Sequence, residues 1–141
     1  MEHTEHVETE IRELHQFFET WFNGDCEQTE SNFARFRDVL DDEFQLISPC
    51  GDIDDRDALL ESLWNAWGHP TDEGDTMSIW IEDCQIRHQT SDTVLATYQE
   101  WQQTNDDDPS TRLSTVLFHR DDQGPNQLRW LHVHETWLAG P

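Results

Sequence analysis

The sequence predicts a two-layer α+β domain, in which three N-terminal helices pack on one face of an antiparallel sheet. Apolar residues recur at helical spacing through most of the first half of the chain. After Asp75 the period changes to two, which is typical of half-buried strands. Three helices are too few to cover both faces of such a sheet, so we expect two layers. The predicted order is helix, helix, strand, helix and then four strands, in one domain of residues 1–141.

The two N-terminal helices are each indicated by one apolar face. In the first helix this face is a stripe interrupted by Glu and Gln, made of Ile11, Leu14, Phe17, Phe18, Trp21 and Phe22. We expect this helix to end near Asn23 and Gly24. The second helix has an apolar face of Phe33, Phe36, Val39 and Leu40, and either Thr29 or Ser31 is expected to cap its start.

A short strand and a third helix follow. The stretch EFQLISP (residues 43–49) alternates, with Phe44, Leu46 and Ser48 on one side. The third helix is expected to begin at Asp54 or Asp55, since a carboxylate can cap a helix and favours its positive end. Its apolar stripe consists of Leu59, Leu60, Leu63, Trp64 and Trp67. Gly68, followed by Pro70, is expected to end it.

Four long segments with strand periodicity make up the C-terminal half of the chain. They cover residues 76–89, 92–104, 110–122 and 126–138. The short connections QTSD, TNDDDPS and DDQGPN between them are rich in turn-forming residues. Sequential strands with short connections form an antiparallel meander, so we expect this pairing in the sheet.

The charge of the chain excludes several classes of partner. It carries 31 acidic and 8 basic residues, for a net charge of −23. Such a chain repels nucleic-acid phosphates and anionic membranes, so neither is an expected partner. Seven Trp and seven Phe at regular spacing argue against an acidic disordered chain. The composition favours a folded halophilic protein, because a salt-rich cytoplasm screens the repulsion between its carboxylates. The N-terminal stretch MEHTEHVETE has no export signal, so we expect a cytoplasmic location.

The order of elements resembles the nuclear-transport-factor-2-like superfamily, also called SnoaL-like or cystatin-like. The most specific stretch is TVLFHRDDQGPNQLRWLHVHETW, which is similar to the end of the association domains of calcium/calmodulin-dependent kinases. His132, His134 and Thr136 match that ending. The resemblance implies a strongly curved sheet that wraps the helices into a cone, with a pocket at its mouth. The resemblance does not identify a function, since the superfamily includes isomerases, dehydratases, cyclases, an epoxide hydrolase and non-catalytic domains.

The last strand is expected to present different residues to its two faces. By simple alternation, Trp130, His132, His134 and Thr136 share one face. Leu131, Val133, Glu135 and Trp137 share the other, more apolar face. We therefore expect Glu135 to lie at the pocket. The resemblance implies that the outer sheet face forms a homodimer, which would then use Trp130, His132 and His134.

A metal site is the alternative interpretation of the two histidines. Side chains at i and i+2 on a strand can chelate zinc or iron with a third ligand, for which His119 and His88 are candidates. However, no carboxylate stands at a fixed motif spacing, and the resemblance implies no metal. We expect neither a metal ion nor a cofactor.

The pocket offers candidates for acid/base chemistry and for ligand binding. Glu135 and Glu100 lie within strand patterns, and Tyr98 and Arg112 could act as electrophiles. The aromatic wall is expected to include Trp64, Trp80, Trp101 and Trp137. Three hypotheses follow: a homodimeric domain that binds a small apolar or carbonyl-bearing molecule, a lyase, isomerase or hydrolase that uses a pocket carboxylate, and an assembly domain without ligand.

Overall fold

The computed structural model describes residues 2–69 and 74–139. The helices are α1 (Glu2–Phe22), α2 (Glu30–Arg37) and α3 (Arg56–Asn65). The strands are β1 (Leu40–Ile47), β2 (Ile53–Asp55), β3 (Met77–Gln89), β4 (Thr93–Thr104), β5 (Ser110–Arg120) and β6 (Leu128–Ala139), and a 3-10 turn, η1 (Pro125–Gln127), precedes β6. The four long strands confirm the predicted segments. Pro70, expected to help end the third helix, lies outside the described residues.

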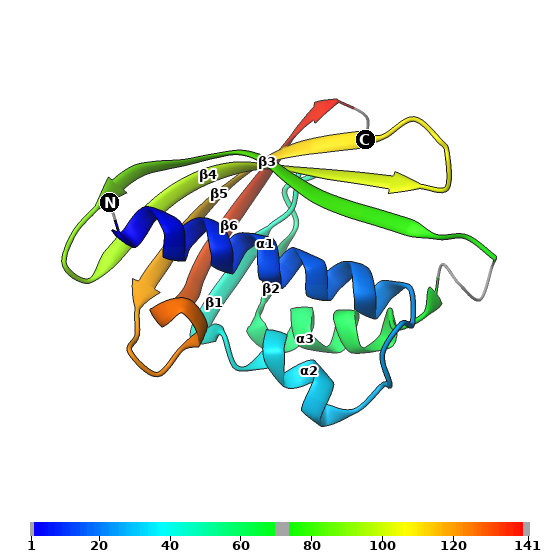
Figure 1. The fold of residues 1–141 in the computed structure, drawn as a ribbon, viewed down its shortest axis with the longest axis horizontal. Helices are drawn as coiled ribbons and strands as arrows, with labels where there is room; N and C mark the ends of the chain where they lie inside the picture. Colours follow the sequence, from blue (N-terminus) through cyan, green and yellow to red (C-terminus); the bar gives the residue numbers. More distant parts are fainter. Residues whose placement is uncertain (1, 70–73, 140–141) are drawn as a thin grey trace.

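The strands form one curved, open sheet in the order β2-β1-β6-β5-β4-β3. All three helices lie on the same side of this sheet (Figure 1). The predicted α+β fold class is therefore confirmed. The meander β3 to β6 is antiparallel, as expected, but β1 runs parallel to β6. The sheet is thus mixed, and β2, which the sequence did not indicate, is a short antiparallel partner of β1.

Two of the helix starts use the predicted caps. The Thr29 side chain accepts a hydrogen bond from the backbone N–H of Asn32, and Asp55 accepts one from Ala58. The second helix is shorter than predicted, because Asp38 closes it and Leu40 already pairs with Trp130 in the sheet. The expectation that Val39 and Leu40 extend the helical face is therefore wrong.

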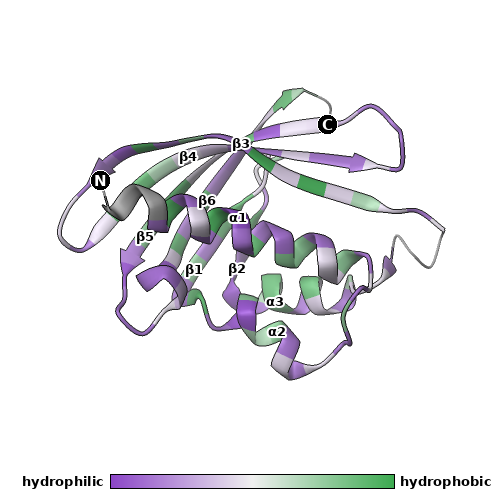
Figure 2. Ribbon diagram, viewed as in Figure 1, coloured by the Kyte–Doolittle hydropathy of each residue, from purple (hydrophilic) through white to green (hydrophobic). Residues whose placement is uncertain are grey.

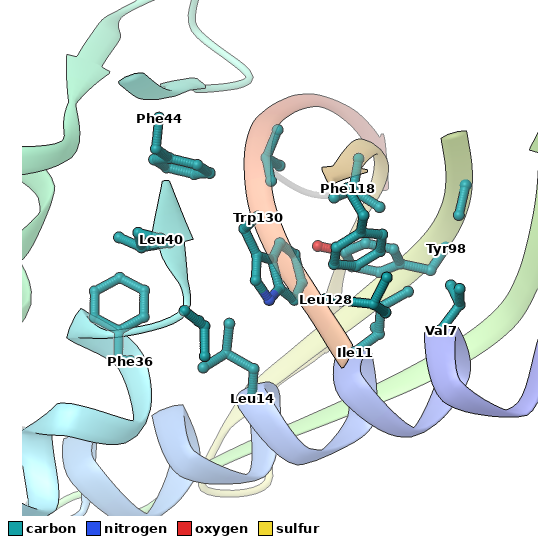
Figure 3. Packing of buried hydrophobic residues seen from close by; sticks show 14 of the residues in the cluster. Val7, Ile11, Leu14, Phe36, Leu40, Phe44, Tyr98, Phe118, Leu128 and Trp130 are labelled. Atoms are coloured by element: carbon teal, nitrogen blue, oxygen red, sulfur yellow. The ribbon is translucent and has the colours of Figure 1, made fainter. Parts of the chain in front are cut away.

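The core lies between α1 and the inner face of the sheet. Val7, Ile11 and Leu14 on α1 are fully or almost fully buried. Figure 3 shows the Trp130 ring between two groups of core residues, with Phe36, Leu40 and Phe44 on one side and Tyr98 and Phe118 on the other. Apolar and polar residues alternate along the strands, as Figure 2 shows, which fits a sheet with one buried face.

A bulge in β6 corrects the predicted orientation of Trp130. Leu117 pairs with His132, but the next residue of β5, Phe118, pairs with Trp130, so Leu131 is an extra residue in β6. The bulge reverses the alternation on its N-terminal side. Trp130 is therefore only 2% exposed and lies in the core, not on the outer face. Beyond the bulge Val133 and Glu135 face inward, as predicted.

No helix in the described part of the chain is both long enough and apolar enough to cross a membrane.

Candidate functional site

A cavity of about 170 Å³ lies between the helices and the inner face of the sheet. Most of its wall is apolar and comes from α1, α2, α3 and β1. The apolar lining residues are Leu14, Phe18, Phe22, Phe36, Leu40, Phe44, Leu46, Leu59, Leu63, Trp130 and Val133. The polar lining residues are His15, Tyr98, Glu100, Gln102, Arg112 and Glu135. The cavity thus combines a hydrophobic wall with a group of ionisable side chains.

The strand register brings the polar residues together. Glu100 on β4 pairs with Arg112 on β5, which pairs with Trp137 on β6. In the next inward-facing row, Tyr98 pairs with Ser114, which pairs with Glu135. Alternate residues of a strand share a face, so both rows point to the helices. Glu100 is 6% exposed and Glu135 is 8% exposed.

One half of the polar group is centred on Glu100. His15 Nε2 lies 3.0 Å from Glu100 Oε1, and Gln102 donates from Nε2 to Oε2 at 2.6 Å. His15 Nδ1 lies 2.8 Å from the backbone carbonyl oxygen of Ile11. A carbonyl oxygen only accepts, so Nδ1 carries a proton. A second proton, on Nε2, makes His15 a cation that donates to Glu100 as a buried pair.

The other half joins Arg112 and Glu135. Arg112 Nη1 donates to Glu135 Oε1 at 3.3 Å, and the guanidinium carbon lies 4.6 Å from the centre of the Trp137 ring. Such stacking of a cation on an indole is attractive. The Arg112 Nε atom is buried and has no hydrogen-bond partner among the described residues. The guanidinium group is therefore only partly satisfied by the protein.

The two carboxyl groups have pKa values shifted in opposite directions. Burial alone would raise the pKa of Glu100, but the charge and hydrogen bond of His15, with help from Arg112 and Gln102, lower it to about 2. Burial and the negative charge of Glu100 raise the pKa of Glu135 to about 7, against the opposing effect of Arg112. Glu100 is thus an ionised acceptor, whereas Glu135 exchanges a proton near neutral pH.

Burial also governs the two neighbouring titratable groups. Burial would lower the pKa of His15, but the charge and hydrogen bond of Glu100 outweigh it and the pKa is raised. Burial and the nearby carboxylates raise the pKa of Tyr98 well above its ordinary value, so its hydroxyl group stays protonated. His15 therefore supplies the positive charge that keeps Glu100 ionised.

The structure brings together the four candidates for acid/base chemistry. Glu135, Glu100, Tyr98 and Arg112 all line the cavity. The sequence left open which face of β4 looks inward, and the burial of Tyr98 and Glu100 answers this.

The structure places the four tryptophans of the predicted aromatic wall outside the lining of this cavity. Trp64, Trp80, Trp101 and Trp137 are not among the residues that line the cavity. Trp80 and Trp101 form a cross-strand pair with stacked rings 5.9 Å apart, on the face opposite Ile79 and Tyr98. Trp64 packs on Trp21 and Phe33. The aromatic wall is made instead of Phe18, Phe22, Phe36, Phe44, Tyr98 and Trp130.

Two site residues were missed from the sequence. His15 lies one turn after Ile11, within the apolar stripe of α1, and a titratable residue in such a stripe was the available signal. Gln102 continues the inward-facing row of Tyr98 and Glu100 by one alternation. Both act on Glu100, and no spacing motif connects them in the sequence.

The two histidines of β6 lie away from the cavity. His134 is exposed and His132 is partly exposed, and neither is among the residues that line the cavity. Within residues 2–69 and 74–139, no three His, Cys, Asp or Glu side chains are grouped so that they could hold a metal ion.

Most of the chain matches a known protein family. Residues 7–139 match the family model described as sucrose-6-phosphate phosphohydrolase C-terminal. Sucrose-phosphatase 2 of Nicotiana tabacum is 24% identical over 133 residues, which cover 93% of this chain and 30% of that protein. The chain therefore spans only about 30% of the length of the curated relatives that it matches.

Solved structures agree on the fold. An NTF-2 like protein of unknown function from Pseudomonas aeruginosa has a TM-score of 0.81 and 27% identity, with 95% of this chain and 99% of that chain covered. A protein from Exiguobacterium sibiricum, solved as a candidate calcium/calmodulin-dependent kinase II association domain, has a TM-score of 0.60 and 15% identity, with 96% and 92% covered. The resemblance inferred from the sequence is thereby confirmed at the level of the fold.

Proposed function

The chain belongs to the family of sucrose-6-phosphate phosphohydrolase C-terminal domains and has the NTF2-like fold, and from this premise we propose that it is a small-molecule-binding domain. One observation supports the proposal above the others. The cavity has an apolar aromatic wall and a few convergent polar groups, the combination found in small-molecule sites. An apolar cavity of roughly 150 Å³ is known to hold benzene in another protein, so about 170 Å³ is sufficient for a small ring.

The cavity favours an apolar ligand with one oxygen function over a sugar phosphate. The names of the relatives suggest a phosphorylated sugar, which is large and carries charge and many hydroxyl groups. Arg112 is the only arginine among the lining residues, and it already pairs with Glu135. Phosphate recognition favours several cations that are free to pair with the phosphate. Among the lining residues the cationic side chains are Arg112 and His15, and each is already paired with a carboxylate. We therefore propose a small apolar or carbonyl-bearing molecule as the ligand.

Filling the cavity tests the proposal. Ethylbenzene and acetophenone would be titrated against the native chain while the protein NMR spectrum is recorded. Leu63 on α3 lines the cavity, so Leu63→Phe is expected to abolish the shifts. Leu60→Phe is the matched control, since Leu60 lies on the same helix but does not line the cavity. If neither compound perturbs residues around the cavity, the third hypothesis of an assembly domain without ligand takes its place.

Acid/base catalysis is the second candidate, because a carboxyl group with a pKa of about 7 lies beside the cavity. A general base is most effective when its pKa is near the working pH. Ionised Glu135 could remove a proton from the carbon next to a ligand carbonyl, with Arg112 stabilising the oxygen that gains charge. The test is deuterium exchange of the acetophenone methyl protons in heavy water. Catalysis requires a rate that rises with pH through about 7 and is lost in Glu135→Gln.

We also propose a homodimer through the outer face of the sheet, without Trp130. We define this outer face as the outward residues of three central strands: Leu95, Thr97, Gln99, Trp101, Leu113, Thr115, Leu117, His132, His134 and Thr136. None of these residues is acidic, although the chain has 31 acidic residues. Two copies with a charge of −23 repel each other, so contact is least costly where carboxylates are absent.

The test of the dimer is its mass in solution. Sedimentation would be compared for the native chain, for Leu117→Glu at the centre of the outer face and for Ser62→Glu, a control on exposed α3. The proposal requires that only Leu117→Glu lowers the mass toward one chain. If the native chain sediments as a monomer at high protein concentration and high salt, the proposed dimer is rejected.

A further inference from the structure

The hydrogen bonds inside the polar group decide which of its atoms can serve a ligand. Both oxygens of Glu100 are occupied, one by His15 and the other by Gln102. Within the described residues, the hydrogen bonding of Glu135 involves Oε1 alone. Arg112 donates one hydrogen bond, which is long at 3.3 Å, and its Nε has no partner in the same part of the chain. Among the lining residues that touch the ion pair, Glu135 and Arg112 therefore keep hydrogen-bonding capacity that a ligand could use.

A ligand group placed between these two residues would be best matched if it were an acceptor. A guanidinium group has five N–H donors and no acceptor, and a protonated carboxyl group has one O–H donor. On β6, Glu135 comes two residues before Trp137, the cross-strand partner of Arg112, so Glu135 and Arg112 lie in adjacent inward-facing rows. Both side chains line the same cavity, whose remaining wall is mostly apolar.

We propose that the cavity binds its ligand through an oxygen atom that accepts hydrogen bonds from Arg112 and from the protonated carboxyl group of Glu135. The ligand class is an apolar body with a carbonyl or carboxyl oxygen, and binding favours the form of the protein that holds a proton on Glu135. This inference rests on the proposed ligand-binding function, and it specifies the chemistry and the regulation of that same site.

The surroundings of Glu135 favour the protonated form when a neutral ligand enters. The charged and titratable groups that face it are Glu100 and Tyr98 from β4, Arg112 from β5 and His15 from α1. The residues that line the cavity from α3 are Leu59 and Leu63, which carry no charge. A ligand that displaces water from this space lowers the local polarity, which disfavours the ionised carboxylate. Ligand binding should therefore be accompanied by proton uptake near neutral pH.

Three compounds of one shape test the inference. Acetophenone offers a carbonyl oxygen, ethylbenzene offers only carbon and hydrogen, and 1-phenylethylamine offers a cationic donor. Each would be titrated into the native chain by calorimetry at pH 6 and at pH 8.5. At pH 6 we expect acetophenone to bind about tenfold more tightly than ethylbenzene, as two modest hydrogen bonds would give. At pH 8.5 most of the advantage of acetophenone over ethylbenzene should be lost. At pH 6 the amine should bind more weakly than the other two compounds.

Variants of Glu135 separate its role from the stability of the fold. Glu135→Gln keeps an N–H donor at every pH, so the advantage of acetophenone should persist and become independent of pH. Glu135→Leu removes one of the two donors and leaves Arg112, so the advantage of acetophenone should be smaller than in the native chain at pH 6 and should no longer depend on pH. Glu61→Gln is the control, because Glu61 is exposed on α3 and should leave the native pH dependence unchanged. Ethylbenzene binding reports in each case that the cavity is intact.

The oxygen can belong to a neutral carbonyl compound or to an acid, and a fourth compound distinguishes them. Benzoate that binds more tightly than acetophenone at pH 6, with uptake of one proton, identifies a carboxylic acid as the ligand class. The reverse order identifies a ketone or amide. Equal and pH-independent binding of ethylbenzene and acetophenone would overturn the inference and leave the proposed apolar site intact. An advantage that grows with pH also overturns it, and no binding of any compound rejects both proposals.

Discussion

At the scale of single residues, neighbours determine the different behaviour of two similar carboxyl groups. Glu100 on β4 and Glu135 on β6 both lie on the inner face of the sheet, and both are buried. Glu100 has a cationic partner in His15 and is ionised, whereas Glu135 faces the charge that Glu100 keeps. One carboxylate therefore raises the pKa of the other, and the site holds an exchangeable proton.

The raised pKa of Glu135 predicts that the protein loses stability as pH rises from about 4.5 to about 7. In this window the folded chain binds more protons than the unfolded chain, so the free energy of unfolding falls with pH. Glu135→Gln removes this effect. The variant should be more stable than the native chain by about 2 kcal/mol at pH 8, with little gain at pH 4.5. Urea unfolding at the two pH values measures it, and a gain of equal size at both would contradict the explanation.

A second buried carboxylate, Glu10, predicts a large loss of stability on truncation. Glu10 is fully buried and accepts hydrogen bonds from Arg35, Asn126 and Trp130 at 2.7 to 3.2 Å. Glu10→Ala leaves these donors without their acceptor and should cost about 3 kcal/mol.

Glu13 provides the matched control for this prediction. It also lies near Arg35, at 3.5 Å, and also accepts a hydrogen bond from Asn126, but its side chain is 55% exposed. Glu13→Ala should cost less than about 1 kcal/mol. Chemical denaturation measures the loss of stability in both variants. Similar losses would show that burial of Glu10 contributes little.

At the scale of the elements, alternation and capping predicted most of the fold, but not its local irregularities. The four long strands and the caps Thr29 and Asp55 follow from residue types close in sequence. The bulge at Leu131 does not, because it depends on how β6 pairs with β5. Alternation alone consequently placed Trp130 on the wrong face, while Glu135, beyond the bulge, was placed correctly.

The sequence likewise predicted the residues of the candidate site that lie on strands, but not those that reach it from elsewhere. The sequence indicated Glu135, Glu100, Tyr98 and Arg112, since each continues a strand pattern. It did not indicate His15, which reaches Glu100 from a helix 85 residues away in the chain. The four predicted tryptophans fell elsewhere because large aromatic residues stabilise many parts of a fold, including the outer pair of Trp80 and Trp101.

The cap of α3 gives a prediction for an element that lines the cavity. Asp55 accepts a hydrogen bond from Ala58 at 2.9 Å, and α3 carries the lining residues Leu59 and Leu63. Asp55→Ala should destabilise the protein by about 1 kcal/mol, because a backbone donor loses its partner. Asp55→Asn keeps the acceptor and should remain within a few tenths of a kcal/mol of the native chain. Thermal unfolding measures both, and equal losses would point to the charge of Asp55 rather than to the cap.

At the scale of the whole molecule, the arrangement of charge follows the two faces of the sheet. The inner face holds a small polar group in an apolar wall, and the outer face carries no acidic residue on the central strands. Apart from Glu100 and Glu135, the acidic residues of the described part of the chain lie on the helices, on β1 to β3 and in the loops, including the exposed run Asp106, Asp107 and Asp108 between β4 and β5. A compact chain with this charge repels itself unless salt screens the repulsion.

Stability should consequently depend strongly on salt. The screening length is about 30 Å at 0.01 M salt and about 3 Å at 1 M, so repulsion between surface carboxylates acts across the whole molecule only in dilute salt. We expect the melting temperature to rise by at least about 3 °C between these concentrations of KCl, as a gain of about 1 kcal/mol would give.

Removing part of the charge separates screening from other effects of salt. The triple variant Asp106→Asn, Asp107→Asn and Asp108→Asn should melt higher than the native chain at 0.01 M KCl and equally at 1 M, because it relieves only the unscreened repulsion. Its control replaces the exposed, uncharged loop residues Ser91 and Gln123 by Asn, which should change neither value. Calorimetric scans at the two salt concentrations measure the difference. A native melting temperature that does not change with salt would contradict the expectation that this chain is adapted to a salt-rich cell, whereas a triple variant stabilised equally at both concentrations would assign the effect to local structure.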